Sequence, residues 1–212
     1  METVKRIHAA HWRYAGFLGI LALILLLCHL FFESHLMTIS PLTHVLSDLD
    51  PVRFGRPNSP TLLAKAYGVV ATLFSINFYF YFRESMPGLF RDGARLFAIM
   101  QVLVFIVLGL TEFNHGYLLL DVLYMLITGC VVLLATTAFF LFTCASLDRS
   151  FGWFGKFAAI GLAGMIIGTL LTILAPLTSL VFAEQINLFT VIIFNAIMGV
   201  FQLTYPIEKE MC

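Results

Sequence analysis

Six long apolar runs, separated by short polar segments, dominate this sequence. Each run is close to the ~20 residues that an α-helix needs to cross a bilayer. Soluble domains carry roughly 25% charged residues, whereas 11% of the 212 residues here are charged and the mean hydropathy is +0.97. The sequence therefore predicts an all-α, polytopic membrane helix bundle of six transmembrane helices, with residues 1–212 forming a single integral membrane domain.

The ends of the apolar runs give the boundaries of the spans. The first run is longer than the ~7–15-residue core of a signal peptide and no small-x-small cleavage site follows it, so we interpret it as an uncleaved span. Small residues recur along the fifth run, which lets another helix approach closely, within the chain or between chains. Pro176 is expected to kink the far end of that span. The predicted spans are 14–33, 61–82, 96–112, 117–142, 157–182 and 187–205.

The longest polar interruption is residues 40–60, which holds four of the seven prolines. Ser40-Pro41 is a helix-start signal, with Ser as the N-cap and Pro at the first helical position. Apolar residues then recur at helical spacing until Asp50-Pro51, which ends the pattern. The sequence predicts a short amphipathic helix over about residues 41–49 of this first outer loop, lying in the membrane surface.

Basic residues predict the orientation of the bundle, because Lys and Arg accumulate in cytoplasmic loops. Three of them, Arg53, Arg56 and Lys65, fall on the side opposite the termini. We therefore expect both termini to be cytoplasmic and residues 34–60 and 113–116 to be external, in the plasma (inner) membrane. The zero net charge gives no indication of a nucleic-acid partner. Nine basic residues fall on the side of the termini: Lys5, Arg6, Arg13, Arg83, Arg91, Arg95, Arg149, Lys156 and Lys209.

The external side gathers the residues best suited to bind a ligand. The short turn after the third span makes spans three and four antiparallel neighbours, which brings its polar residues toward the first outer loop. One interpretation is a polar pocket; the other is a solvated rim whose ion pairs hold the loop against the membrane. The residues expected to bind a ligand are Arg53, Arg56, Asn58, Lys65, Glu112, Asn114 and Asp121.

Chemistry on this side would depend on histidine and carboxylate groups. His44 and Asp48 are four residues apart and share a helix face, so they could act as a general-base pair, and His115 is a further catalytic candidate. A metal ion, if present, would be bound by His44, Asp48, Glu112 and His115. The chain has no HExxH, HxxxH or CxxC pattern, and we predict no cofactor.

Within the membrane the spans are almost free of charge, and their polar residues are few. Ser75, Asn77, Gln101 and Asn195 are predicted to form hydrogen bonds between helices. Ion-coupled carriers place ionisable groups near the membrane midplane, and these spans lack them, which argues against a proton-coupled transporter.

The order of parts resembles an uncharacterised bacterial family of six-span membrane proteins, known as a domain of unknown function. The resemblance rests on Ser40-Pro41 and Ser47-Asp48 in the first outer loop and on Asn114-His115 after span three. The Ser-Asp pair is also similar to one in the eukaryotic six-span lipid-remodelling and autophagy-modulator family. The first resemblance implies a six-span fold, and neither implies a mechanism.

The sequence favours a non-enzymatic role, as an outward-facing protein that binds a lipid or small ligand, or as an accessory or sensor protein. Arg53 and Arg56 would then bind an anionic group such as a lipid phosphate. Membrane lipids are the expected partners, with a small ligand or a membrane-protein partner as alternatives, and the oligomeric state is left open. The second interpretation is a membrane-embedded lipid hydrolase or transferase. The third is a transporter, which would need a polar path past Gln101 and Asn195.

Overall fold

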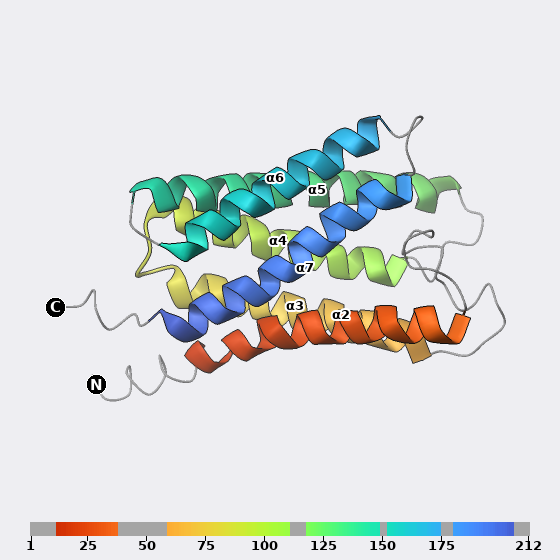
Figure 1. The fold of residues 1–212 in the computed structure, drawn as a ribbon, viewed down its shortest axis with the longest axis horizontal. Helices are drawn as coiled ribbons and strands as arrows, with labels where there is room; N and C mark the ends of the chain where they lie inside the picture. Colours follow the sequence, from red (N-terminus) through yellow and green to blue (C-terminus); the bar gives the residue numbers. More distant parts are fainter. Residues whose placement is uncertain (1–11, 38–58, 111–117, 149–151, 175–179, 206–212) are drawn as a thin grey trace.

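The computed structural model describes residues 12–37, 59–110, 118–148, 152–174 and 180–205, all of them helical or in short turns. α2 and α7 lie side by side, and α2 begins at the end of the bundle where α7 ends (Figure 1). We call this the termini end, and the opposite end the far end. The helices are α2 (Gly16–Met37), α3 (Ser59–Phe82), α4 (Gly88–Leu110), α5 (Leu118–Asp148), α6 (Trp153–Ile173) and α7 (Leu180–Thr204).

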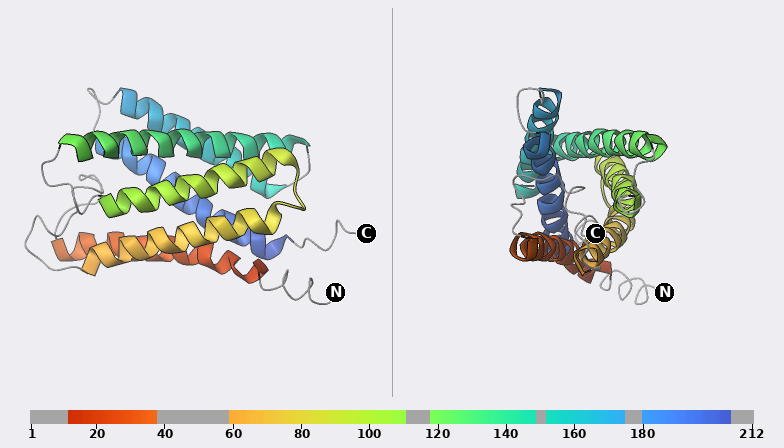
Figure 2. Two further views of the ribbon diagram at one scale, coloured as in Figure 1. Left: turned by 180° about the vertical axis from the view of Figure 1, so that it is seen from behind. Right: turned by 90° about the vertical axis from the view of Figure 1, so that its right-hand side faces the viewer.

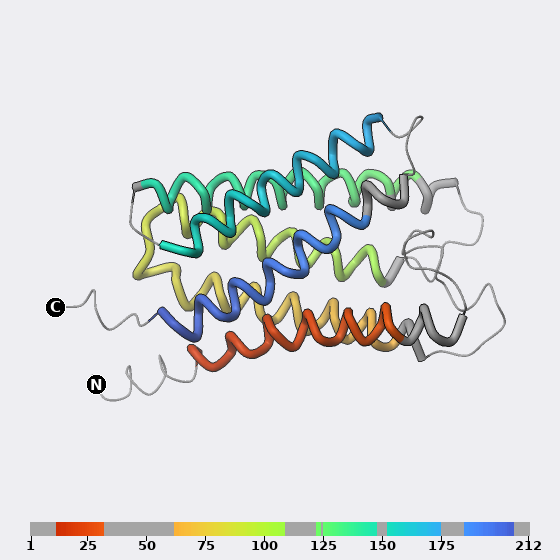
Figure 3. Tube along the Cα trace, viewed as in Figure 1, coloured from red at the N-terminus to blue at the C-terminus, as the bar shows by residue number. Residues whose placement is uncertain are grey.

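The six helices form a ring in chain order. Each helix packs against the one before it and the one after it, and α7 packs back on α2, which closes the ring (Figure 2). α3 and α7 also make a smaller contact across the ring. Successive helices from α2 to α7 run alternately toward the far end and toward the termini end (Figure 3). This is the packing of an antiparallel helix bundle, with short connections everywhere except between α2 and α3.

Five of the six described helices are long and apolar enough to cross a membrane: Trp12–Phe31, Leu62–Phe82, Met125–Leu147, Trp153–Ile173 and Gln185–Thr204. The prediction of an all-helical, multi-pass integral membrane protein is therefore confirmed. α4 is not among the five. Its first two turns carry Arg91, Asp92 and Arg95.

The start of α4 corrects the predicted third span, which began at residue 96. α4 begins at Gly88, directly after Pro87, so Arg91 and Arg95 lie on the helix and not in a loop. Phe90 is fully buried and Arg91 is exposed, so these turns are amphipathic and the charged side leaves the bundle. A search for uninterrupted apolar residues misses such turns, because their charges lie on one face only.

The boundary between α6 and α7 also differs from the prediction. α6 ends at Ile173, three residues before Pro176, and α7 begins at Leu180. Residues 180–182 therefore belong to the last helix, and the predicted fifth span was too long. Proline lacks a backbone N–H and clashes with the carbonyl four residues earlier, which explains why a helix ends before it. Residues 175–179, including Pro176, lie outside the described residues, as does the predicted amphipathic helix over 41–49.

Glycines set the closest helix contacts. A Cβ on Gly16 of α2 would meet the carbonyl oxygen of Gly199 on α7, and a Cβ on Gly199 would meet the carbonyl oxygen of Gly16. The backbones of α2 and α7 therefore touch at this crossing. The small residues of α6 face inward: Gly161 packs on Phe139 of α5, and Gly168 packs on the α7 side chain of Asn187. They serve contacts within the chain.

The half of the bundle at the termini end is sealed by aromatic rings, whose centroids lie 4.3 Å apart for Phe154 and Phe201 and 4.4 Å apart for Phe139 and Phe194. Aromatic pairs of this kind add to the energy of close packing. Ten phenylalanines in this half, at most 2% exposed, come from α3 to α7: Phe74, Phe78, Phe82, Phe90, Phe97, Phe139, Phe142, Phe154, Phe194 and Phe201.

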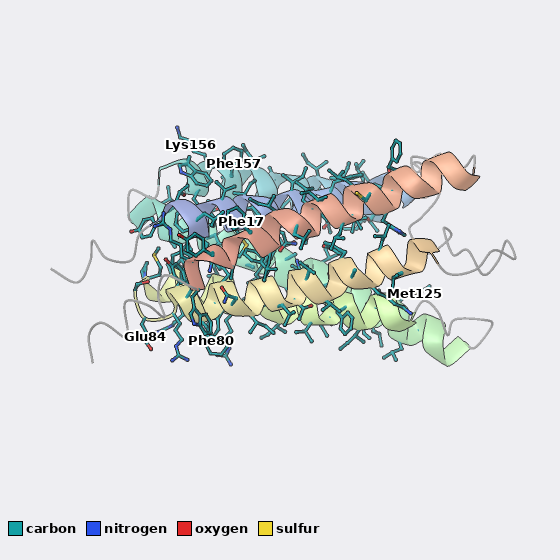
Figure 4. The ribbon with its side chains drawn as sticks, turned by 90° about the horizontal axis from the view of Figure 1, so that it is seen from below. Phe17, Phe80, Glu84, Met125, Lys156 and Phe157 are labelled. Atoms are coloured by element: carbon teal, nitrogen blue, oxygen red, sulfur yellow. The ribbon has the colours of Figure 1, made fainter. Side chains whose placement is uncertain are left out.

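Exposed aromatic and charged residues also gather at the termini end. Phe80, Phe157, Glu84 and Lys156 lie there, whereas Met125 lies toward the far end (Figure 4). The guanidinium of Arg83 sits 5.2 Å from the ring centre of Phe80. Aromatic rings beside basic side chains are typical of the boundary between lipid tails and headgroups.

Candidate functional site

Most residues that the sequence singled out lie outside the described part of the chain. This holds for His44, Asp48, Arg53, Arg56, Asn58, Glu112, Asn114 and His115, and for the side chain of Asp121 on the first turn of α5. Their convergence into a pocket therefore stays a prediction. Lys65 is described: it lies on α3 near the far end and is partly exposed. Among the described residues, no group of three or more His, Cys, Asp or Glu is placed to hold a metal ion.

The predicted hydrogen bonds between helices are confirmed for Asn77. Its side-chain oxygen accepts a 2.7 Å hydrogen bond from Nε2 of Gln202 on α7. The prediction is wrong for Ser75, whose hydroxyl donates to the carbonyl of Ala71 on its own helix at 2.6 Å. A serine in a helix often bonds the carbonyl four residues back, because that acceptor is always within reach.

Gln202 joins three helices at the termini end. Besides Asn77 on α3, its Nε2 donates to the carbonyl of Trp12, just before α2, at 2.6 Å. The neighbouring Arg13 donates from Nε to the carbonyl of Leu203, also at 2.6 Å. These bonds tie the start of the first described helix to the end of the last one. We call Arg13, Asn77 and Gln202 the termini clamp.

The side chains of Gln101 and Asn195 meet at mid-height of the bundle, together with a residue that the sequence did not single out. The hydroxyl of Tyr67 on α3 is close enough to interact with the side-chain amides of Gln101 on α4 and Asn195 on α7. All three side chains are at most 1% exposed. We call them the polar trio, and they are the candidate binding site among the described residues.

The polar trio lacks hydrogen bonds of acceptable geometry. The Tyr67 hydroxyl lies near both amides, but neither it nor the side-chain nitrogen and oxygen atoms of Gln101 and Asn195 make a hydrogen bond of good distance and angle. A hydrogen bond beside the trio involves backbone, since Thr72 donates to the carbonyl of Gln101 at 3.1 Å. The predicted contacts of Gln101 and Asn195 between helices are therefore present through Tyr67, without a well-formed hydrogen bond.

The polar trio lies at a boundary within the bundle. Phe97 is one turn from Gln101 toward the termini end, Phe194 precedes Asn195 in α7, and the two rings lie 5.9 Å apart, as a floor of aromatic side chains. On the side of α2 and α3, the ring of Tyr67 packs in a second apolar cluster with Leu26. Partly buried apolar side chains border this cluster toward the far end: Leu30, Val104, Leu108 and Leu188.

On the far-end side of this boundary, the described side chains of α4 to α7 are less buried. No described residue is fully buried over 102–108 of α4, 122–134 of α5, 169–174 of α6 or 185–190 of α7. Six or more consecutive residues of an α-helix cover every face of it, so the sides that face neighbouring helices are only partly buried in these stretches, with Val104, Leu108 and Leu188 packed against the second apolar cluster. In the half at the termini end, α4 to α7 each carry fully buried side chains.

Tyr67 and Gln202 were missed from sequence for different reasons. Tyr67 was not singled out from the sequence, although it lies on α3 away from the belt of exposed rings at the termini end. Its position, away from that belt, is the signal that could have marked it. Gln202 lies in the last turns of α7, where a polar residue is ordinary.

Comparisons with protein-family models, with curated proteins and with solved structures found no match for this chain. The fold and the polar trio therefore rest on the residues themselves.

Proposed function

We propose that this integral membrane protein binds a lipid or another small apolar ligand at its far end, without catalysing a reaction. One observation carries the proposal. The half at the termini end holds ten fully buried phenylalanines, while the described residues over 102–108, 122–134, 169–174 and 185–190, toward the far end, include none that is fully buried. Small-molecule sites are mostly apolar, accessible regions with a few polar groups, and between helices of a bundle is a common location for them.

The far end is proposed to face outward. Among described side chains at the termini end, Arg13, Arg83, Arg91, Arg95 and Lys156 outnumber Glu84 and Asp92, five to two. Lys and Arg near span ends favour the cytoplasmic side. With both chain ends on that side, the sixth helix, α4, also crosses the membrane in this proposal, and its charged first turns lie at the cytoplasmic surface.

The first outer loop is proposed to contribute the polar contacts of an anionic ligand. Arg53 and Arg56 would bind a lipid phosphate through paired N–H donors, and the nearby acids and His115 would orient them. The resemblance to the uncharacterised bacterial six-span family fits this arrangement of parts and remains part of the proposal.

The experiment compares lipids that co-purify with the wild type and with the double variant Arg53→Ala, Arg56→Ala, quantified by mass spectrometry. The matched control is Arg91→Ala, Arg95→Ala, which removes two exposed arginines from the termini end. We expect the loop variant to lose most bound anionic lipid while the melting temperature stays unchanged, and the control to keep it. Unchanged lipid content in the loop variant would contradict the role of these arginines.

A further inference from the structure

We infer that the polar trio binds the hydroxyl group of an apolar molecule that enters the bundle from the far end. The inference deepens the proposed function and rests on it. The polar trio would bind a neutral group at mid-height of the bundle. Arg53 and Arg56, proposed to bind an anionic group, belong to the first outer loop.

The first argument is the unmet hydrogen bonding of the trio. Tyr67, Gln101 and Asn195 together present amide N–H donors, carbonyl acceptors and a hydroxyl that does both. All three are at most 1% exposed, and none has a hydrogen bond of acceptable geometry. Leaving such groups unpaired costs a few kcal/mol each in an apolar interior, and a bilayer offers no water to replace the partner. A polar group supplied from outside the protein would remove that cost.

The second argument is that other polar residues in the spans do find partners. Ser75, Thr136 and Thr190 donate to carbonyls of their own helices, and Asn77 accepts from Gln202. Thr128 and Asn187 each also have a buried oxygen without a partner, but these are isolated residues. The trio brings three polar side chains from α3, α4 and α7 together without pairing them.

The third argument concerns the charge of the ligand. Gln101 and Asn195 have no charged residue within a full turn on either side in sequence, and Lys65 lies two residues before Tyr67, on a different face of α3. An ion at this depth would be costly without a countercharge. The bound group is therefore neutral.

The fourth argument separates a hydroxyl from other neutral groups. A carbonyl or an ether can only accept, so it brings no donor for the amide oxygens and leaves the Tyr67 hydroxyl as the one donor of the trio besides the amides themselves. A hydroxyl both donates and accepts, so it can pair with an amide oxygen and an amide N–H together. Its apolar body would lie against the partly buried side chains of Val104, Leu108 and Leu188, on the far side of the aromatic floor.

The test uses a long-chain alcohol with a mid-chain diazirine as a photoactivatable probe, and the methyl ether of the same alcohol as the matched ligand control. The full-length protein in lipid nanodiscs is irradiated with each probe, and labelled positions are mapped by mass spectrometry. We expect saturable labelling by the alcohol around residues 104–108 and 188. At a concentration below saturation, the ether should label these positions about tenfold more weakly, as loss of one hydrogen bond at a buried site predicts.

Two variants connect the labelling to the trio. Tyr67→Phe removes the hydroxyl and keeps the buried ring, and Gln101→Leu removes the amide at similar volume. Both should lower alcohol labelling toward the level of the ether. Ser75→Ala is the control, because Ser75 is equally buried but bonds its own helix. The melting temperature of Tyr67→Phe shows whether the bundle stays folded.

The outcomes are distinct. Equal labelling by alcohol and ether, or full labelling of the folded Tyr67→Phe variant, overturns the hydroxyl site and leaves the proposed function in place. Absence of labelling by either probe around residues 104–108 and 188 overturns both. Alcohol-specific labelling that is lost in Tyr67→Phe and Gln101→Leu but kept in Ser75→Ala establishes the site.

Discussion

The two halves of this bundle are built from the same helices but packed differently. At the termini end, phenylalanines from five helices interlock and the termini clamp joins α2, α3 and α7. Toward the far end, the second apolar cluster covers the side of α2 and α3, while the described residues of α4 to α7 are less buried. In lipid, helix association depends on close packing and hydrogen bonds, so the first half should contribute more to the stability of the fold.

Removing a buried aromatic ring should give the largest difference in unfolding free energy between the two halves. Phe154→Ala deletes a fully buried ring that contacts Phe142, Phe194 and Phe201. We expect a loss of about 3–5 kcal/mol in unfolding free energy, the usual cost of a large core truncation. Unfolding in mixed detergent and dodecyl sulfate micelles measures it.

The control for this prediction is Leu133→Ala in the far half of α5, where the side chain is 69% exposed. It should change stability by less than about 1 kcal/mol. Equal losses at the two positions would remove the contrast between the halves.

The crossing of α2 and α7 gives the next largest effect. Gly199→Leu would place a side chain against the backbone of Gly16, so the helices must separate. Overpacking of this kind costs roughly 1–3 kcal/mol and sometimes more. The melting temperature in detergent should fall accordingly.

Gly129→Leu on α5 is the matched control, because a Cβ there meets nothing within 4 Å. That variant should keep the wild-type melting temperature. A drop as large as that of Gly199→Leu would show that the leucine, and not the crossing, is responsible.

The termini clamp should contribute less than the rings. Gln202→Leu removes both donors of Nε2 and leaves the carbonyl of Trp12 and the side-chain oxygen of Asn77 without them. We expect about 1–3 kcal/mol of destabilisation, measured by the same unfolding assay. Gln202→Glu, which keeps the shape but loses the N–H donors, should behave similarly; a stable Gln202→Leu protein would argue against the clamp.

The smallest effect is expected from metal removal. If the far end binds a ligand without catalysis, elemental analysis of the purified protein should find less than roughly one tenth of a zinc or iron per chain, and chelation should leave stability unchanged. About one metal per chain, lost in His115→Ala, would instead favour the lipid hydrolase or transferase interpretation.

The sequence predicts the class of fold well, because length and apolar character alone define membrane spans. It misplaces the start of α4, where the charges occupy one face, and the start of the last helix, which includes residues 180–182. The convergence of Tyr67 with Gln101 and Asn195 could not be predicted in this way. In a span that is apolar on every face, the sequence has no polar and apolar sides to show which face meets the neighbouring helices. The rotation of the helix about its own axis is then determined by packing.

The difference between the halves can be measured most directly by footprinting the protein in nanodiscs with a small apolar carbene precursor. The account predicts labelling of Val104, Leu108 and Leu188, on the far side of the polar trio, and protection of Phe97, Phe139 and Phe194 on the other side. Equal protection of both sets would show that the far half is sealed like the rest, and would contradict a binding role for it.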